Sequence, residues 1–171
     1  MLSAKLNGGQ DVTFAINISG RSLGAPSFLE FVTEQIAASR VPPHKVCFEI
    51  TETSAIAELA HALRFIETLK ALGCQFALDD FGTGLSSFSY LKTLSVDYLK
   101  IDGGFVRGLA ESETDHAIVT AVHHIGHIMG IRTIAEWAES DVILEKLRQI
   151  GVDYAQGNAL GEPQPLDVMG M

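Results

Sequence analysis

Short apolar runs alternate with segments of helical periodicity along most of this chain of 171 residues. The apolar runs have the length and composition of buried strands and lie at residues 12–18, 46–50, 75–80, 96–101, 132–136 and 152–156. Between them, apolar residues recur at helical spacing over residues 28–38, 59–72, 86–94, 115–129 and 141–150, and glycine closes several of these segments. The pattern predicts six strands that alternate with five helices.

Strands that alternate with helices form parallel sheets, because each helix carries the chain back to the start of the next strand. No linker, low-complexity tract or second composition regime interrupts the alternation. We therefore expect a single α/β domain. It is built either as an open doubly wound sheet or as a (β/α) barrel.

Polar residues at the ends of the predicted strands favour the barrel. Each predicted strand has at least one of them at or near its carboxyl end: Asn17, Glu49, Asp79 with Asp80, Lys100, Glu136 and Gln156. In a barrel these ends meet on one face around one pocket, which is where such enzymes carry their chemistry. An open sheet would instead spread them along a line, with a crevice only at its switch point.

The stretch Phe76-Ala-Leu-Asp-Asp-Phe-Gly-Thr-Gly84 delivers two adjacent carboxylates at the end of a predicted strand. Neighbouring residues on a strand point to opposite faces. Asp79 and Asp80 can therefore act on one ion only where the strand ends and the backbone turns. The glycines at positions 82 and 84 indicate such a turn.

Gathering Glu49, Asp79, Asp80 and Glu136 in one pocket costs free energy unless protons or metal ions neutralise them. Carboxylates and the amide of Asn17 are oxygen ligands that suit hard ions such as Mg²⁺ or Mn²⁺. Asp79 has the position to bridge two ions, and a two-metal site activates water for attack on phosphorus and stabilises the leaving oxygen. Lys100, the one cation in the series, would orient that water or stabilise charge on the phosphoryl oxygens.

The formal charge of −9 opposes binding to a DNA or RNA duplex, because acids outnumber Lys and Arg by 21 to 12. No apolar run approaches the roughly 18 to 20 residues of a membrane-spanning helix, and the start of the chain has no signal-peptide pattern. Cys47 and Cys74 lack metal-ligand spacing and are interpreted as buried thiols in a reducing compartment. We expect a cytoplasmic segment without membrane contact, whose parent could still be anchored through other domains.

Several features of the sequence can be explained by structure alone, without a role in function. The tripeptide Asp80-Phe81-Gly82 also occurs in protein kinases, but no other kinase motif accompanies it. His123 and His127 have metal-pair spacing, yet they fall on a polar stripe of the predicted helix and are interpreted as solvent-facing. Trp137 either packs at the rim of the pocket or stacks on a base.

Six segments together resemble the successive signatures of the EAL domain, the family of bacterial cyclic-di-GMP phosphodiesterases. They are Ile16-Asn-Ile-Ser19, Phe48-Glu-Ile-Thr-Glu52, Leu78-Asp-Asp-Phe-Gly-Thr-Gly-Leu-Ser-Ser-Phe88, Tyr98-Leu-Lys-Ile-Asp102, Ile134-Ala-Glu136, and Gln156-Gly157 with Pro163. The resemblance runs from about residue 12 to residue 165, in order and with the expected spacing.

The resemblance implies a (β/α)8 TIM-barrel-like fold that uses two Mg²⁺ or Mn²⁺ ions to open cyclic-di-GMP to linear pGpG. It also implies roles for individual residues: Asn17, Glu49, Asp79 and Asp80 as metal ligands, Lys100, Glu136 and Asp80 as catalytic residues, Glu52 as the anchor of the loop after Asp80, and Gln156, Gly157 and Pro163 at the substrate and its loops.

This chain departs from the family pattern in what precedes Asn17. The family takes its name from a Glu-x-Leu motif whose Glu is a metal ligand. This motif is expected well upstream of Asn17, and residues 1–16 do not contain it. We therefore expect residues 1–171 to be the C-terminal portion of one EAL-type domain, with about six strands present and the first strands missing. Smaller departures are Trp137-Ala138, where Gly-Val is usual, and Asn158, where an aromatic is common.

Two functional hypotheses follow. The first is hydrolysis of cyclic-di-GMP, weak or absent in this chain alone, in a parent protein with upstream sensor or GGDEF-type domains. The alternative is a non-catalytic EAL domain that binds cyclic-di-GMP or serves signalling and dimerisation. In either case an exposed strand edge predicts a homodimer or other self-association.

Overall fold

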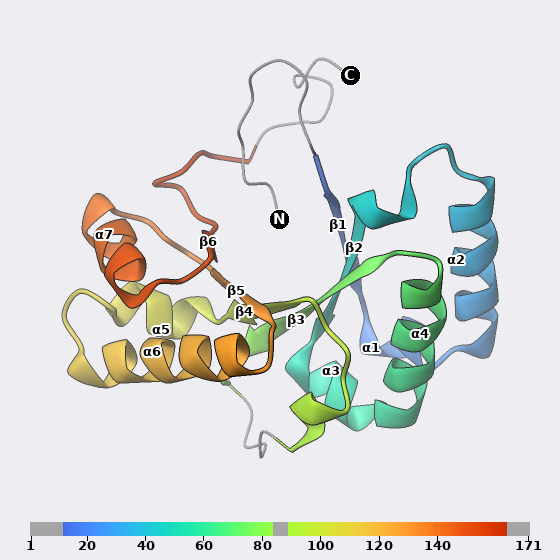
Figure 1. Cartoon of the computed structure of the whole chain (residues 1–171), viewed down its shortest axis with the longest axis horizontal. Helices are drawn as coiled ribbons and strands as arrows, with labels where there is room; N and C mark the ends of the chain where they lie inside the picture. Colours follow the sequence, from blue (N-terminus) through green and yellow to red (C-terminus); the bar gives the residue numbers. More distant parts are fainter. Residues whose placement is uncertain (1–11, 84–88, 164–171) are drawn as a thin grey trace.

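A six-stranded parallel sheet forms the centre of the computed structural model, which describes residues 12–83 and 89–163 (Figure 1). Its strands are β1 (Phe14–Ile18), β2 (Val46–Thr51), β3 (Gln75–Phe81), β4 (Tyr98–Ile101), β5 (Arg132–Ala135) and β6 (Tyr154–Ala155). Each strand pairs in parallel with the next one in the sequence. The predicted six strands are thus confirmed, with bounds that differ by at most two residues.

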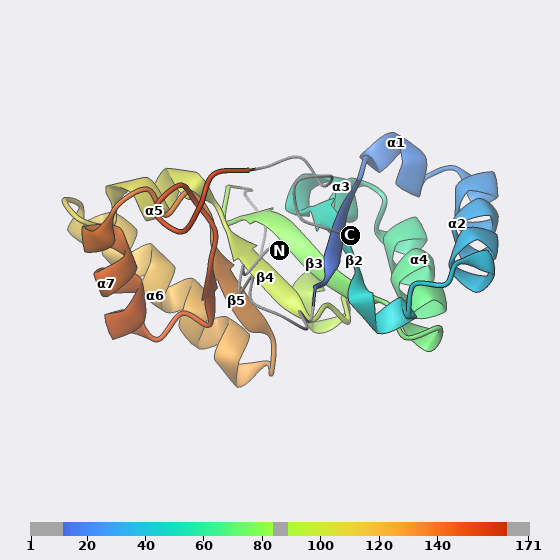
Figure 2. The ribbon, with the colours of Figure 1, turned by 90° about the horizontal axis from the view of Figure 1, so that it is seen from above.

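The order of the strands distinguishes the two architectures left open by the sequence. The sheet runs β1-β2-β3-β4-β5-β6 without reversal, as in a (β/α) barrel, whereas a doubly wound sheet reverses its order at a switch point. Seen from above, the helices lie outside the strands on either side (Figure 2). The α/β, barrel-like prediction is therefore confirmed.

The four long helices are those that the periodicity predicts: α2 (Pro26–Ala38), α4 (Leu59–Ala71), α6 (Glu113–Ile128) and α7 (Asp141–Ile150). Part of the helix expected at 86–94 lies outside the described residues, since residues 84–88 are not described. Its described part contains only the short 3-10 helix η2 (Tyr90–Lys92), and a second 3-10 helix, η1 (Pro43–Lys45), precedes β2.

Three short helices were not predicted: α1 (Gly20–Leu23), α3 (Glu52–Ala57) and α5 (Gly103–Gly108). Each begins directly after a strand, where Ser19, Thr51 or Asp102 caps it by accepting a backbone N–H bond. Helices of four to six residues are too short to show a helical period. In the sequence, the capping residues Ser19, Thr51 and Asp102 are the feature that could have indicated these helices.

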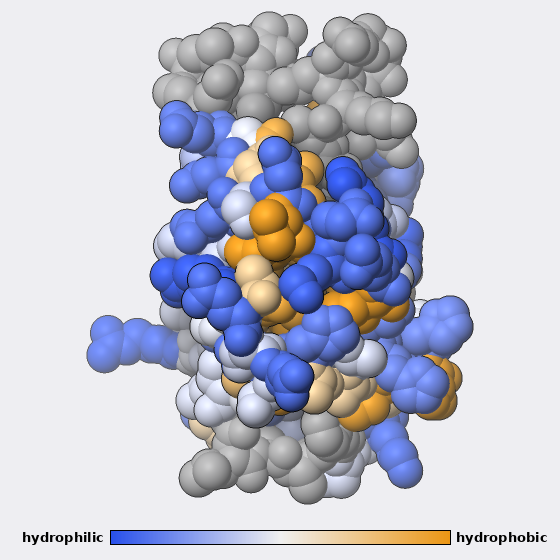
Figure 3. Space-filling model, turned by 90° about the vertical axis from the view of Figure 1, so that its left-hand side faces the viewer, coloured by the Kyte–Doolittle hydropathy of each residue, from blue (hydrophilic) through white to orange (hydrophobic). Residues whose placement is uncertain are grey.

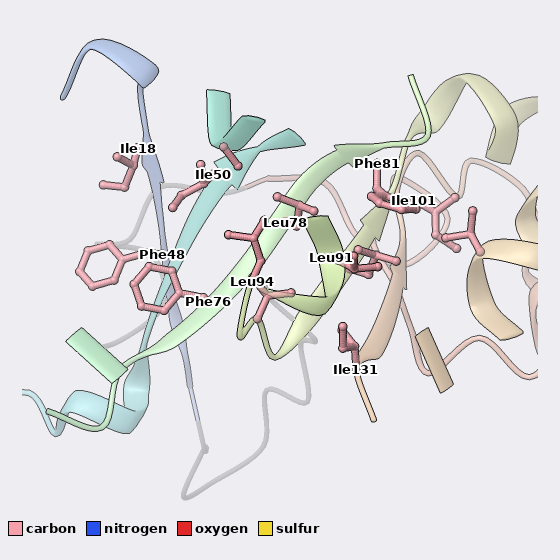
Figure 4. Close-up of a cluster of buried hydrophobic side chains, with 14 of the residues drawn as sticks. Ile18, Phe48, Ile50, Phe76, Leu78, Phe81, Leu91, Leu94, Ile101 and Ile131 are labelled. Carbon is pink, nitrogen blue, oxygen red and sulfur yellow. The ribbon is translucent and has the colours of Figure 1, made fainter. Parts of the chain in front are cut away.

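The outer face of the sheet packs against the helices and forms the main hydrophobic core. Apolar side chains from successive strands line it, among them Phe48, Phe76, Leu78 and Ile101 (Figure 4). The ring of Phe65 on α4 makes edge contacts with Phe48 and Phe76, at centroid distances of 5.8 and 6.0 Å. These contacts fix the helices to the outside of the sheet.

The inner face of the sheet carries a second, smaller apolar cluster of Cys47, Ala77, Tyr98 and Ile134, with Tyr154 packed against it. Side chains two residues apart on a strand point to the same face. The residues two positions after four of these are Glu49, Asp79, Lys100 and Glu136. The predicted site residues therefore share one face with an apolar layer beneath them.

One histidine of α6 departs from the expected solvent stripe, whereas His127 is exposed as expected. His123 is only 15% exposed, and its Nδ1 lies 2.8 Å from Thr133 Oγ1 on β5. Thr133 Oγ1 also donates to Asp153 Oδ2 at 3.0 Å. His123 therefore ties α6 to the sheet, because it projects from the edge of the stripe toward β5.

The face that carries α7 and the ends of α5 and α6 is mostly hydrophilic, with apolar residues in small groups (Figure 3). Among the described residues, no helix combines the length and the apolar character needed to cross a bilayer.

Candidate active site

Lys100 on β4 stands at the centre of a group of carboxylates from three other strands. Its Nζ lies 3.0 Å from Glu49 Oε2, 2.8 Å from Asp79 Oδ1 and 2.8 Å from Glu136 Oε1. Glu49 belongs to β2, Asp79 to β3, and Glu136 directly follows β5. The sequence placed Lys100 apart from the ligand set, whereas the structure makes it their common partner.

Burial sets the electrostatics of this group. The side chains of Lys100 and Glu49 are 4% and 5% exposed, and those of Asp79 and Glu136 are 13% and 12% exposed. Burial disfavours the charged ammonium of Lys100, but Glu49, Asp79 and Glu136 outweigh it and raise its pKa. The pKa of Glu136 is also raised, chiefly by burial and further by Asp79 and Asp80, although Lys100 opposes the shift.

A bulge explains how two adjacent aspartates can serve one site. The pairing of β3 with β4 shifts its register between Leu78 and Phe81, and Asp80 has a left-handed backbone with φ of 53°. The strand continues to Phe81, so the expected end of the strand at Asp80 is wrong, but the expected turn of the backbone occurs within the bulge. Burial, followed by Asp79 and Asp102, raises the pKa of Asp80.

Asp79, Asp80 and Glu136 can hold a cation together. One carboxylate oxygen from each lies within 4.8 Å of the other two. An oxygen-only set of this kind fits a hard divalent ion. Lys100 contacts two of the three residues, so an ion bound here would share those carboxylates with the ammonium.

Glu52 anchors the segment that follows Asp80. It is buried, its Oε2 accepts the backbone N–H of Gly82 at 3.0 Å, and its Oε1 accepts the hydroxyl of Tyr90 at 2.5 Å. Burial and the bond to Glu52 raise the pKa of Tyr90. No role for Tyr90 follows from the sequence, because nothing in a single sequence links residues that lie 38 positions apart.

The remaining predicted site residues lie around this group. Asn17 on β1 pairs in register with Glu49. The backbone of Gln156 bridges β5 and the segment after it, with its N–H donating to Ala135 at 2.8 Å and its carbonyl accepting from Ala138 at 3.0 Å.

Gly157 and Pro163 complete the predicted set. Gly157 lies so close to Ala138 that an added Cβ would be 2.4 Å from its backbone. Pro163 is exposed and belongs to no helix or strand. The structure thus brings together Glu49, Asp79, Asp80, Lys100 and Glu136. Asn17 and Gln156 lie at strand ends near the two edges of the sheet. Pro163 lies outside the strands and helices.

Comparison with known proteins shows the family to which this chain is similar. A family model described as EAL domain matches residues 1–163. Cyclic di-GMP phosphodiesterase PdeB of Shewanella oneidensis is 47% identical over 157 residues, which cover 92% of this chain and 18% of PdeB. The chain therefore spans less than a fifth of the length of that relative.

Solved structures give the same fold. The EAL domain of Mycobacterium smegmatis DcpA superimposes with a TM-score of 0.85 at 35% identity, covering 92% of this chain and 70% of that one. The FimX EAL domain from Pseudomonas aeruginosa, bound to c-di-GMP, superimposes with a TM-score of 0.84 at 32% identity, covering 89% and 62%. On these grounds, and on the match over residues 1–163, the chain belongs to the EAL domain family.

Proposed function

We propose that this chain contributes to the metal-dependent hydrolysis of cyclic-di-GMP to linear pGpG. The observation that carries the proposal is the buried group in which Lys100 contacts Glu49, Asp79 and Glu136, beside the three carboxylates that can share a cation. The 47% identity to a cyclic di-GMP phosphodiesterase supports the choice of substrate.

Asp79, Asp80 and Glu136 would hold the cation, with Glu49 and Asn17 as further oxygen ligands on the neighbouring strands. Mg²⁺ or Mn²⁺ held there, as a pair with Asp79 among the shared ligands, would supply an activated water and would stabilise the leaving oxygen. The ion also neutralises carboxylates that would otherwise repel a phosphodiester. The bulge at Asp80 supports this role, since it turns two adjacent carboxylates toward one point.

Lys100 acts as an ammonium rather than as a base. Burial lowers its pKa, but the carboxylates of Glu49, Asp79 and Glu136 outweigh that effect and raise it, which favours the protonated form. A buried positive charge near the phosphodiester stabilises the negative charge that develops on the phosphoryl oxygens. Its three N–H donors also orient the carboxylates that it contacts.

Glu52 and Tyr90 keep the segment after Asp80 in place. Two hydrogen bonds to one buried carboxylate hold the backbone of Gly82 and the side chain of Tyr90. Because Gly82 lies two residues after Asp80, this anchor limits the movement of the Asp80 carboxylate. Gln156, Gly157 and Pro163 would line the substrate side of the neighbouring loops.

The proposal also covers the cellular compartment of the domain, its parent protein and its self-association. Two buried cysteines that form no disulfide, Cys47 and Cys74, suit a reducing compartment such as the cytoplasm. The chain spans only 18% of PdeB, which supports a parent protein with sensor or GGDEF-type domains. Self-association would bring two such chains together as a homodimer.

Hydrolysis of cyclic-di-GMP, followed by chromatography of pGpG, tests the proposal. In the complete parent protein, we expect turnover to require Mg²⁺ or Mn²⁺ and to stop with EDTA, and Asp79→Asn to lower it about 100-fold or more. Glu67→Gln, at an exposed position on α4, is the matched control and should leave turnover unchanged. Normal turnover by Asp79→Asn in a folded protein would refute the mechanism.

A non-catalytic binding domain is the second candidate. The contact of Lys100 with three carboxylates favours it, because the ammonium already neutralises part of their charge. Calorimetry separates the two candidates. Binding of cyclic-di-GMP without hydrolysis at millimolar Mg²⁺ and Mn²⁺ would support the binding domain.

A further inference from the structure

A chain of hydrogen bonds joins His123 on α6 to the sheet. Nδ1 of His123 lies 2.8 Å from Thr133 Oγ1 on β5, and Thr133 is fully buried. The hydroxyl of Thr133 donates to Asp153 Oδ2 at 3.0 Å, and its backbone N–H donates to the same oxygen at 2.8 Å. Asp153 directly precedes β6, so the chain of bonds links α6, β5 and the start of β6.

These bonds determine which ring nitrogen of His123 carries the proton. A carboxylate can only accept, so the single hydroxyl hydrogen of Thr133 goes to Asp153. Thr133 Oγ1 must then accept from His123, which places the proton of the neutral imidazole on Nδ1. The lone pair of the ring is therefore on Nε2.

The environment of His123 matches that of a histidine that binds a metal ion. Such a histidine donates its second ring N–H to a carboxylate or another acceptor, which orients the ring and raises the basicity of the ligating nitrogen. Here the bond to Thr133 is passed on to the carboxylate of Asp153. Nε2 faces Gly151, where an added Cβ would lie 3.4 Å away. The absence of a side chain at Gly151 leaves space beside Nε2.

His127 supplies a second imidazole at the spacing of a metal-binding pair. Residues four positions apart are neighbours on one face of a helix, and two histidines at this spacing can chelate one ion. The rings of His123 and His127 are 6.2 Å apart between centroids and inclined by 37°. His127 is exposed, so its ring can turn toward Nε2 of His123 without disturbing the core.

The charges around the pair favour a cation. His127 lies in the last turn of α6, where the partial negative charge of the helix end attracts positive charge. Asp153 adds a carboxylate, with Oδ2 4.0 Å from Nδ1 of His123. A packing role alone explains the bond between His123 and Thr133, but it leaves the spacing of His127 to chance.

We propose that His123 and His127 bind a divalent transition ion such as Zn²⁺, at a site separate from the carboxylates. Imidazole suits Zn²⁺, Ni²⁺ and Cu²⁺, whereas the oxygens of Asp79, Asp80 and Glu136 suit Mg²⁺ or Mn²⁺. The two sites lie at opposite edges of the sheet, because α6 carries the chain back from the carboxyl end of β4 to the amino end of β5. The site does not depend on the proposed function.

Calorimetric titration of the complete parent protein with Zn²⁺ tests the site. Excess Mg²⁺ competes for the carboxylates, and the difference between variants isolates the contribution of the histidine pair. His127→Ala should weaken one equivalent of Zn²⁺ about 10-fold or more, because the ion loses its chelating partner. This variant carries the test, since His127 is exposed, whereas His123→Ala would also break the bond to Thr133.

His124→Ala is the matched control. His124 is exposed on the same part of α6, but no histidine lies four positions before or after it. Its loss should leave the affinity for Zn²⁺ unchanged.

The bond from Thr133 can be tested separately. Thr133→Val keeps the shape of the side chain but removes the hydroxyl that orients His123. Loss of such a partner lowers metal affinity about 10- to 100-fold. Thr133→Ser keeps the hydroxyl and should retain the wild-type affinity. Equal affinities in Thr133→Val and the wild type would show that the buried hydroxyl does not prepare His123 for metal, and would overturn that part of the proposal.

Thermal unfolding gives a second measurement. An ion that binds the folded state raises its stability with the logarithm of the ion concentration. The unfolding temperature should therefore rise with Zn²⁺ in the wild type and in His124→Ala, and rise less in His127→Ala.

Three results would overturn the site. The first is a wild-type protein that binds no Zn²⁺ in excess Mg²⁺. The second is wild-type binding that His127→Ala leaves unchanged. The third is an equal loss of affinity in His124→Ala and His127→Ala, which would show non-specific binding to surface histidines.

Discussion

Lys100 Nζ lies 2.8 Å from Asp79 Oδ1, and Asp79 is also one of three carboxylates that can share a cation. In the proposed metal site, this one carboxylate would serve two positive charges, one supplied by the chain and one from solution. In the absence of the ion, the ammonium is what makes the burial of Glu49 and Glu136 tolerable. If the proposed site binds a cation, this contact couples the stability of the domain to its affinity for that cation.

Removal of the ammonium should destabilise the domain and make its stability depend on metal. Lys100→Met leaves three carboxylates without their common partner, and breaking a buried ionic contact of this kind costs about 3–5 kcal/mol. Mg²⁺ should restore part of the loss, because it neutralises Asp79, Asp80 and Glu136. Urea unfolding with EDTA and with 10-fold steps of Mg²⁺ measures both effects.

Lys70→Met is the matched control. Its ammonium lies 2.8 Å from Asp97 Oδ1, but the pair is 27% and 28% exposed. Such pairs contribute about 0–1 kcal/mol, and no Mg²⁺ dependence is expected. Equal losses in the two variants, or a loss in Lys100→Met that Mg²⁺ leaves unchanged, would contradict the coupling.

Glu52→Gln should loosen the segment that carries Asp80. The amide that replaces the carboxylate keeps the shape of Glu52 but weakens its bonds to Gly82 and Tyr90, at a cost of about 1–3 kcal/mol. We expect kcat to fall more than 10-fold, with a smaller change in KM. Tyr90→Phe removes only one of the two bonds and should have the weaker effect, as measured by hydrolysis and thermal unfolding.

Alkaline pH should weaken the domain through Cys47. Burial, followed by the charge of Glu49, raises its thiol pKa from 9.0 to about 12. The folded state holds this proton more tightly than the unfolded state, so the contribution is fully present below pH 9 and is lost as the pH rises toward about 12.

The measurement is the free energy of unfolding between pH 8 and pH 11 for the wild-type chain and for Cys47→Ala. The stability of the wild type relative to the variant should decrease across this interval. A parallel pH dependence in both proteins would show that Cys47 does not titrate as expected. Slow reaction of the native thiol with alkylating reagents at pH 8 would agree with its burial.

The strands, and the membership of the candidate site, could be predicted from the sequence for one physical reason. Parallel strands place their carboxyl ends at one edge, so polar residues that follow apolar runs converge whatever the loops do. For this reason the sequence alone predicts that Glu49, Asp79, Lys100 and Glu136 lie together.

Two kinds of feature could not be predicted: the register between neighbouring strands, and contacts between residues that lie far apart in the sequence. The bulge at Asp80 arises from the register of β3 against β4, and no local pattern specifies it. The contact between Glu52 and Tyr90 joins residues 38 positions apart, and that between Gly103 and Trp137 joins a helix start to a strand end. Such contacts follow from packing, which hydrophobic periodicity does not record.

Gly157→Ala tests how closely the segments after β5 and β6 must approach. The added methyl group would lie 2.4 Å from the backbone nitrogen and oxygen of Ala138, and backbone atoms on both sides cannot yield as a flexible side chain would. The clash should push the two segments apart and displace Glu136, so we expect lower turnover together with a loss of about 1–3 kcal/mol in unfolding free energy. Gly24→Ala is the control, because its added methyl group meets the Glu58 side chain at an ordinary 3.5 Å and its φ of −76° suits alanine. If both variants unfold at the same urea concentration and hydrolyse cyclic-di-GMP at the wild-type rate, the close approach at Gly157 is not what positions Glu136.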